Sequence, residues 1–138
     1  MAIYTDTVRV AAGRAADWLE ANRDKHITGQ LALTTDGHIV PPADPKADCF
    51  CALGRLAKEL SINVPTNGEV YSRLADPLGK AKQNDDIRER LELVYEANDE
   101  DKRNETRPIL DEFEGEVHLA GMAGVNILRK IANDEEII

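Results

Sequence analysis

The sequence has few aromatic residues: one tryptophan, three tyrosines and two phenylalanines among 138 residues. A folded core must therefore be filled mostly by leucine, isoleucine, valine and alanine, and such aliphatic cores suit packed helices. A chain of this length buries about two thirds of its unfolded surface on folding. That area is sufficient for a core without disulfide bonds or a structural metal.

The chain also has only two cysteines, Cys49 and Cys51, in a segment that is predicted to be helical. Residues two apart on a helix point about 200° away from each other, so a disulfide bond between them is not expected. A structural zinc site usually needs four ligands with C-x₂₋₄-C spacing, and His26, His38 and His118 lie in unrelated segments. We expect two reduced thiols in the core, no metal and no cofactor. A zinc site and a nucleophilic cysteine are the less favoured alternatives.

No long apolar run is present. The longest stretch without Asp, Glu, Lys or Arg runs over the twelve residues from Val117 to Leu128, whereas about 20 are needed to cross a bilayer. The first residues lack the basic segment and apolar stretch of a secretory signal. We therefore expect a cytoplasmic protein, in the host cytoplasm if a bacteriophage encodes it.

Catalytic motifs are also missing from the sequence. It contains no Walker phosphate loop, no G-x-G-x-x-G fingerprint, no H-E-x-x-H motif and no G-x-S-x-G elbow. Nothing nominates a base for either cysteine. We therefore assign no catalytic residue; whether the protein is an enzyme stays open, and a non-enzymatic role is favoured.

Basic residues are fewer than acidic ones, 17 against 26, which gives a net charge of −9. Residues 1–95 hold 14 acids and 12 bases, and residues 96–138 hold 12 acids and 5 bases, so the C-terminal third carries −7 of the charge. Direct binding to nucleic acid or to an anionic membrane is not expected, because both need Lys and Arg. A basic protein partner is compatible with this charge. The simpler interpretation is that the acids only keep the protein soluble.

Two helices are predicted from regular stripes of apolar residues. One runs from Thr5 or Asp6 to Asn22, and the other from Asn84 or Asp85 to Asn98-Asp99. The stripes consist of Val8, Ala12, Ala15 and Leu19 in the first helix and Ile87, Leu91, Val94 and Tyr95 in the other. Residues 69–83 fit either a short helix or an ordered loop.

A helix over Pro45–Leu60 is predicted at the centre of the fold. Asp44 is a suitable N-cap, and proline fits the first helical position. Helical spacing of the apolar residues predicts that Leu53 and Leu56 are almost fully buried. Before this helix, the Asp-Gly pair at residues 36 and 37 predicts a β-hairpin at about residues 30–40.

A last helix is predicted from about Thr106 to Ala132, on a stripe of Leu110, Phe113, Val117, Ala120, Gly124, Leu128 and Ile131. From Arg107 to Ala132 it would be about 39 Å long, at 1.5 Å per residue. That length exceeds what one small core covers. Either the helix breaks around Gly121 to Gly124, or residues 117–138 project or mediate an interaction. A homodimer is the commonest way to cover such a stripe.

These segments predict a mainly α fold: one domain over residues 1–138, with four to five helices and one short β-hairpin. The predicted interaction surface lies in its C-terminal third. It combines acidic residues with small or apolar ones: Asp111, Glu112, Glu114, Glu116, Gly121, Gly124, Leu128 and Ile131.

The most specific local pattern is Phe50-Cys51-Ala52-Leu53-Gly54-Arg55-Leu56, followed some forty residues later by Asn98-Asp99. A turn-containing segment, Ile27 to Pro42, precedes it. In this order the motifs resemble a family of small bacterial and bacteriophage proteins known only as a domain of unknown function. The resemblance covers roughly Ala15 to Glu114 and implies no activity.

Two residues of this pattern permit either a structural or a ligand-binding interpretation. Gly54 inside a helix indicates close packing of another backbone, for example the first helix, or the floor of a ligand pocket. Asn98 continues the apolar stripe of its helix, so its amide must bind a local group or a ligand. A pocket, if present, is expected near Cys51, Gly54, Asn98 and Asp99.

Two classes of function follow. The favoured one is a non-catalytic, acidic interaction protein that binds a basic protein partner or acts as a nucleic-acid mimic, as some small bacteriophage proteins do. The alternative is a small-molecule-binding domain or small enzyme with a pocket near Cys51, Gly54 and Asn98.

Overall fold

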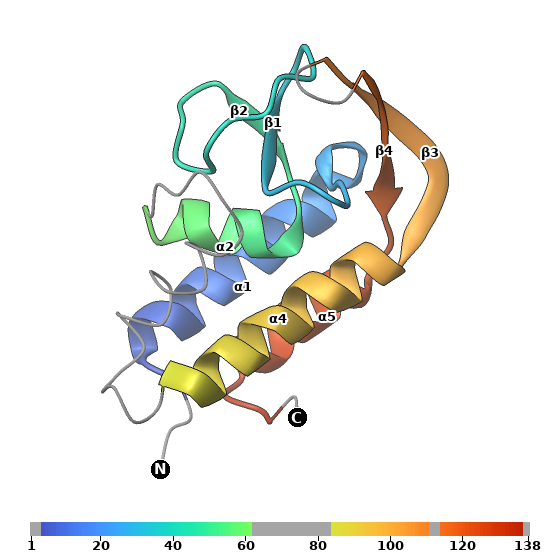
Figure 1. The fold of residues 1–138 in the computed structure, drawn as a ribbon. Coiled ribbons are helices and arrows are strands. Elements are labelled where there is room, and N and C mark those ends of the chain that lie inside the picture. Colours follow the sequence, from blue (N-terminus) through green and yellow to red (C-terminus); the bar gives the residue numbers. More distant parts are fainter. Residues whose placement is uncertain (1–3, 62–83, 111–113, 137–138) are drawn as a thin grey trace.

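The computed structural model describes residues 4–61, 84–110 and 114–136, with the backbone alone over residues 84–88. These residues form four α-helices, one short 3₁₀ helix and two antiparallel pairs of strands (Figure 1). Their order is α1 (Asp6–Ala21), η1 (Arg23–Lys25), β1 (Ala32–Thr34), β2 (Ala47–Phe50), α2 (Ala52–Glu59), α4 (Asn84–Glu100), β3 (Lys102–Ile109), β4 (Gly115–Ala120) and α5 (Ala123–Ala132).

Helix α1 begins and ends where the sequence predicts. Thr5 is its N-cap, with an extended backbone and a side chain that accepts a hydrogen bond from the Val8 N–H (3.4 Å). The predicted stripe is buried, and Trp18 beside it is half-buried. Small alanines on this face allow α5 and α2 to approach closely.

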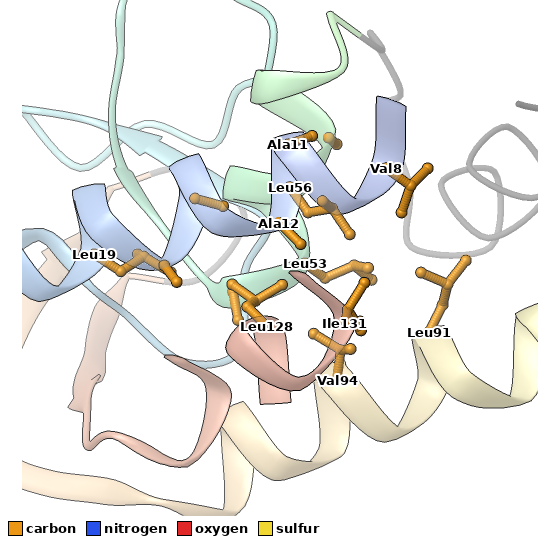
Figure 2. Close-up of a cluster of buried hydrophobic side chains, with 14 of the residues drawn as sticks. Val8, Ala11, Ala12, Leu19, Leu53, Leu56, Leu91, Val94, Leu128 and Ile131 are labelled. Carbon is orange, nitrogen blue, oxygen red and sulfur yellow. The ribbon is translucent and has the colours of Figure 1, made fainter. Parts of the chain in front are cut away.

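The larger hydrophobic cluster lies between α1, α2, α4 and α5. Figure 2 shows Leu53 and Leu56 of α2 within this cluster, with Leu128 of α5 and Val94 of α4 near Leu53. Both leucines are 0% exposed, which confirms their predicted burial. Each such side chain contributes about 2 kcal/mol when it leaves water. Within the described residues, none of the helices has both the length and the apolar character that crossing a membrane requires.

The two sheets are joined by the segment His26–Thr28. The Ile27 N–H donates to the Phe50 carbonyl of β2 (3.0 Å), and the Thr28 N–H donates to the His118 carbonyl of β4 (2.9 Å). The Ala120 N–H in turn donates to the His26 carbonyl (2.8 Å). Hydrogen bonding therefore continues from β1 and β2 across this segment to β4 and β3. A second, smaller cluster packs among these strands: Ile27, Leu33, Cys49, Ile109, Val117 and Leu119.

The predicted mainly α fold with one hairpin is wrong, because the described residues combine helices with two strand pairs in an α+β arrangement. Strands β3 and β4 together replace the first half of the predicted last helix. The prediction for residues 69–83 lies outside the described residues.

The predicted helix Pro45–Leu60 is also wrong in its first part. Helix α2 begins only at Ala52, and Ala47–Phe50 form strand β2, which pairs with β1. Asp44 closes a turn instead of capping a helix: its carboxylate accepts from the Lys46 N–H (2.8 Å). The expected turn at Gly37 is present, with φ +95° and a hydrogen bond from the Thr34 N–H to the His38 carbonyl (2.8 Å). The second arm of the expected hairpin pairs with β1 through a single antiparallel bridge, Leu33 to Ile39, whereas the strand that pairs along the length of β1 is β2.

The predicted helix Arg107–Ala132 is replaced by two strands and a ten-residue helix, α5. Along β4, buried Val117 and Leu119 alternate with exposed Glu116 and His118, the period of a strand packed on one face. A helix of ten residues is only about 15 Å long. The length argument for a projecting end that needs a second copy therefore no longer holds.

Candidate functional site

The motif residues Cys51, Gly54 and Asn98 meet at the interface between the helices and the strands. Cys51 lies between the end of β2 and the start of α2, Gly54 lies in the first turn of α2, and Asn98 lies in the last turn of α4. All three are buried, and Asp99 is half-buried beside them. His26 contacts Asn98 from the neighbouring strand segment. We call the four residues Cys51, Asn98, Asp99 and His26 the junction cluster.

Asn98 uses its whole side-chain amide within the protein. Its Oδ1 accepts from the Ala52 N–H (3.1 Å) and from Nε2 of His26. Its Nδ2 donates to the Ile27 carbonyl (3.0 Å) and to the Asp99 carboxylate (3.2 Å). A primary amide has two donors and two acceptor lone pairs, so all four positions are filled. No capacity is left for a ligand, and the structural interpretation of Asn98 is the one that fits.

Cys51 is the N-cap of α2. Its Sγ accepts a hydrogen bond from the Gly54 N–H (3.2 Å), and its own N–H donates to the Leu31 carbonyl (3.3 Å). Desolvation by burial raises the pKa of the thiol to about 12. The thiol is therefore protonated and poorly nucleophilic at neutral pH. Cys49 lies in the smaller cluster, and both thiols are free.

Gly54 provides space for another backbone and not for a ligand. A Cβ at this position would lie 1.9 Å from the Leu31 carbonyl oxygen. The close neighbour is thus the segment before β1, whereas the sequence suggested the first helix. Neither interpretation of the sequence identified Leu31.

Asp99 fixes the loop that follows the His26–Thr28 segment. One carboxylate oxygen accepts from the Gly29 N–H (2.9 Å) as well as from Asn98. Gly29 has φ +82°, a conformation that L side chains rarely adopt. The pair Asn98-Asp99 therefore ties the end of α4 to the strand segment from two sides.

His26 is the member of the junction cluster that the sequence did not predict. It is 0% exposed, and desolvation by burial lowers its pKa to about 4; the charges of Arg23 and Arg103 lower it further, against the hydrogen bond to Asn98. The imidazole is therefore neutral at pH 7. Since Asn98 Oδ1 is an acceptor, His26 donates from Nε2, and Nδ1 carries the lone pair. No motif marks this residue in the sequence.

Asp101 is a second residue that sequence reasoning missed. Its carboxylate accepts from the Ala123 N–H (3.0 Å) at the start of α5, and its carbonyl accepts from the Gly121 N–H (2.7 Å). A Cβ on Gly121 would lie 2.2 Å from this carboxylate. In the sequence Asp101 follows Asp99 and Glu100, and its capping role depends on a partner 22 residues away.

The predicted interaction surface divides into three parts. Asp111 and Glu112 lie outside the described residues. Glu114 and Glu116 are exposed on the β3–β4 hairpin. The rest lie largely inside the protein: Gly121 faces Asp101, and Gly124, Leu128 and Ile131 are buried among the helices.

A row of acids on α4 is the feature that replaces this surface. Glu89, Glu92, Glu96 and Glu100 follow one side of the helix at spacings of three and four residues, and all are exposed. None of the four forms an ion pair with another described residue. We call this row the α4 acidic face.

Two hollows on the described surface lie away from the junction cluster. One, of about 480 Å³, is polar and lies between residues 34–38 and 45–48. The other, of about 400 Å³, lies between α1 and the end of α2. Among the described residues, no group of three or more His, Cys, Asp or Glu side chains is placed to hold a metal ion.

Comparison with known proteins finds no significant match to this chain among protein-family models, curated proteins or solved structures.

Proposed function

We propose that this protein is a non-catalytic interaction protein that binds a basic protein partner through the α4 acidic face. The observation that carries the proposal is the row Glu89, Glu92, Glu96 and Glu100, exposed and without ion pairs among the described residues. The eleven residue steps from Glu89 to Glu100 place these side chains along about 16.5 Å of helix.

The chemistry of the junction cluster supports a non-catalytic role. A nucleophile and a base need exposure and pKa values near the working pH. Here the Cys51 thiol is buried with a pKa of about 12, and the His26 imidazole is buried with a pKa of about 4. Asn98 has no free donor or acceptor. The alternative, a pocket near Cys51, Gly54 and Asn98, has no support in this geometry.

The energetics of the α4 acidic face favour a basic partner. Four like charges on one side of a helix repel one another, and a partner that brings Lys or Arg relieves this repulsion. Such exposed charges steer association and make it sensitive to salt, since screening acts over about 8 Å at physiological ionic strength. A nucleic-acid mimic is the special case in which the partner's basic surface otherwise binds phosphates.

The compartment and the family stay parts of this proposal. We place the protein in the cytoplasm and retain its resemblance to the domain of unknown function. The stripe that suggested a homodimer, which includes Leu128 and Ile131, is covered within the chain. The proposal therefore concerns a different, basic partner.

The test uses a labelled, Lys- and Arg-rich helical peptide as the probe and measures binding by fluorescence anisotropy at several salt concentrations. We expect the double variant Glu92→Gln/Glu96→Gln to weaken binding at least fivefold. The matched control Glu114→Gln/Glu116→Gln removes the same charge from the exposed hairpin, and we expect a change of less than twofold.

Equal weakening by both variants would show that only net charge matters, and no weakening by the first would remove α4 from the site. Either result overturns the proposal. In a second arm, the protein is added to a complex of the same peptide with duplex DNA. Displacement of the DNA from the peptide supports the mimic form. If the protein binds the free peptide through α4 and does not displace DNA, the mimic form is wrong and the protein partner stands.

A further inference from the structure

We propose that a single enclosed water molecule bridges the side chains of Arg23, His26 and Arg103, where η1 meets β3 and β4. Three buried nitrogens carry this inference: Nε of Arg23, Nδ1 of His26 and Nε of Arg103. None of them has a hydrogen-bond partner among the described residues. Buried polar groups without partners are rare in proteins, and buried water typically binds groups that have no protein partner.

The three side chains are connected through one small region of backbone. Arg103 donates from Nη2 to the Arg23 carbonyl, and Arg23 donates from Nη2 to the Ala120 carbonyl (3.1 Å). The Ala120 N–H donates to the His26 carbonyl (2.8 Å). The charges of Arg23 and Arg103 also act on the His26 imidazole. These contacts place the three residues on neighbouring segments, and the proposal assigns their unpaired nitrogens to one shared site.

The donor and acceptor roles match water. Each Arg Nε–H is a donor, and His26 Nδ1 is an acceptor because Nε2 carries the proton that is donated to Asn98. One water accepts from the two arginines and donates to the histidine, which makes the three hydrogen bonds that a buried water typically has. An anion would leave the Nδ1 lone pair facing negative charge, and a cation would face two guanidinium groups.

Arg107 provides an internal comparison on the same strand. Its side chain is 27% exposed, as is that of Arg103, and it also reaches η1. Its Nε, however, donates to the Asp24 carbonyl (3.1 Å), so it needs no water. Arg103 lies within the β3 register shift between Lys102 and Thr106, whereas Arg107 lies in the regularly paired part of the strand.

The proposed water gives the shifted part of β3 a structural link to the junction cluster. Arg103 would reach His26 through the water, and His26 reaches α4 through Asn98. The hairpin and the helix that carries the acidic face would then share one hydrogen-bonded network.

The test is a high-resolution crystal structure of the whole protein, with a bromide soak to identify anions by anomalous scattering. We expect one water within about 3.2 Å of His26 Nδ1 and of both Arg Nε atoms. Bromide at this position, a direct protein partner for Nδ1, or density that contacts only one of the three groups would overturn the proposal. This measurement needs no variant, so a failure to fold cannot obscure it.

Solution NMR adds a matched pair of variants. In the wild type we expect water–proton cross-peaks to the Nε–H protons of Arg23 and Arg103 that persist at neutral pH. Arg103→Lys removes one bridging donor and should abolish the cross-peak at Arg23, whereas Arg107→Lys should leave it unchanged. If folded Arg103→Lys retains the Arg23 cross-peak unchanged, Arg103 does not hold the water and the bridge is wrong.

Discussion

The two faces of α4 differ in burial and in how their polar side chains are paired. On the inner face, Leu91, Val94 and Asn98 are at most 3% exposed, and the amide of Asn98 has every donor and acceptor paired. On the outer face, Glu92 and Glu96 are exposed and have no ion pair with the described residues. A buried polar group without a partner costs free energy, whereas an exposed carboxylate is already paired with water. The inner face therefore fixes the fold, and the outer face is free to carry function.

The largest expected effect comes from breaking the inner face at Asn98. Asn98→Ala leaves the Ala52 N–H, the Ile27 carbonyl and His26 without partners in the interior. We expect a loss of about 4 kcal/mol in the free energy of unfolding, measured by urea denaturation. Asn126→Ala, on the exposed side of α5, is the control and should change stability by less than about 0.5 kcal/mol. Equal effects of the two variants would contradict the role of Asn98.

A second test concerns backbone contact beside the same face. Gly54→Ala would place a Cβ 1.9 Å from the Leu31 carbonyl oxygen, so α2 or the segment before β1 must move. We expect the free energy of unfolding to fall by about 3 kcal/mol, measured by thermal or urea denaturation. Gly115→Ala is the control, because no described atom lies within 4 Å of the added Cβ. A stable Gly54→Ala variant would show that the close approach is unnecessary.

The junction cluster also predicts how stability depends on pH. The pKa of His26 is about 4 in the fold and about 6.5 in an unfolded chain. As the pH falls below 6.5, the unfolded chain binds a proton that the folded chain does not, so stability is lost between pH 6.5 and 4. This histidine alone should cost about 2 kcal/mol between pH 7 and pH 5.

Urea unfolding at the two pH values measures this loss. His26→Gln should remove most of it, because glutamine does not titrate, and the exposed His118→Gln should not. If His26→Gln leaves the pH dependence unchanged, another group is responsible.

The smallest expected effect is on the outer face. Glu100→Gln removes a negative charge near the C-terminal end of α4, where the last turn has no basic residue. We expect a gain of about 0.3 kcal/mol, because the helix dipole disfavours an acid there. Glu92→Gln/Glu96→Gln should change the free energy of unfolding by less than about 0.5 kcal/mol while weakening the binding of the basic peptide probe. A large loss of stability would mean that the outer face is structural.

Part of the candidate site was predictable from sequence. Cys51, Gly54 and Asn98 were named together, and they do meet in space. Their role as fully paired structural groups was one of two open interpretations. His26 and Asp101 were missed because their partners, Asn98 and Ala123, lie 72 and 22 residues away. The α4 acidic face was not identified either, because the charge of the C-terminal third was assigned to a helix that does not exist.

The sequence by itself determined α1 and α4. Each has a cap or a polar start and a long apolar stripe at helical spacing, and both signals lie within the helix. The strands were decided by tertiary structure. Residues 102–109 form an exposed strand without apolar alternation, so only their pairing with β4 reveals them. Ala47–Phe50 carried a local helix signal and became a strand, because hydrogen bonds to β1 and to Ile27 satisfy their backbone across the fold. A helix satisfies its backbone within its own segment, whereas a strand depends on partners that a local pattern does not contain.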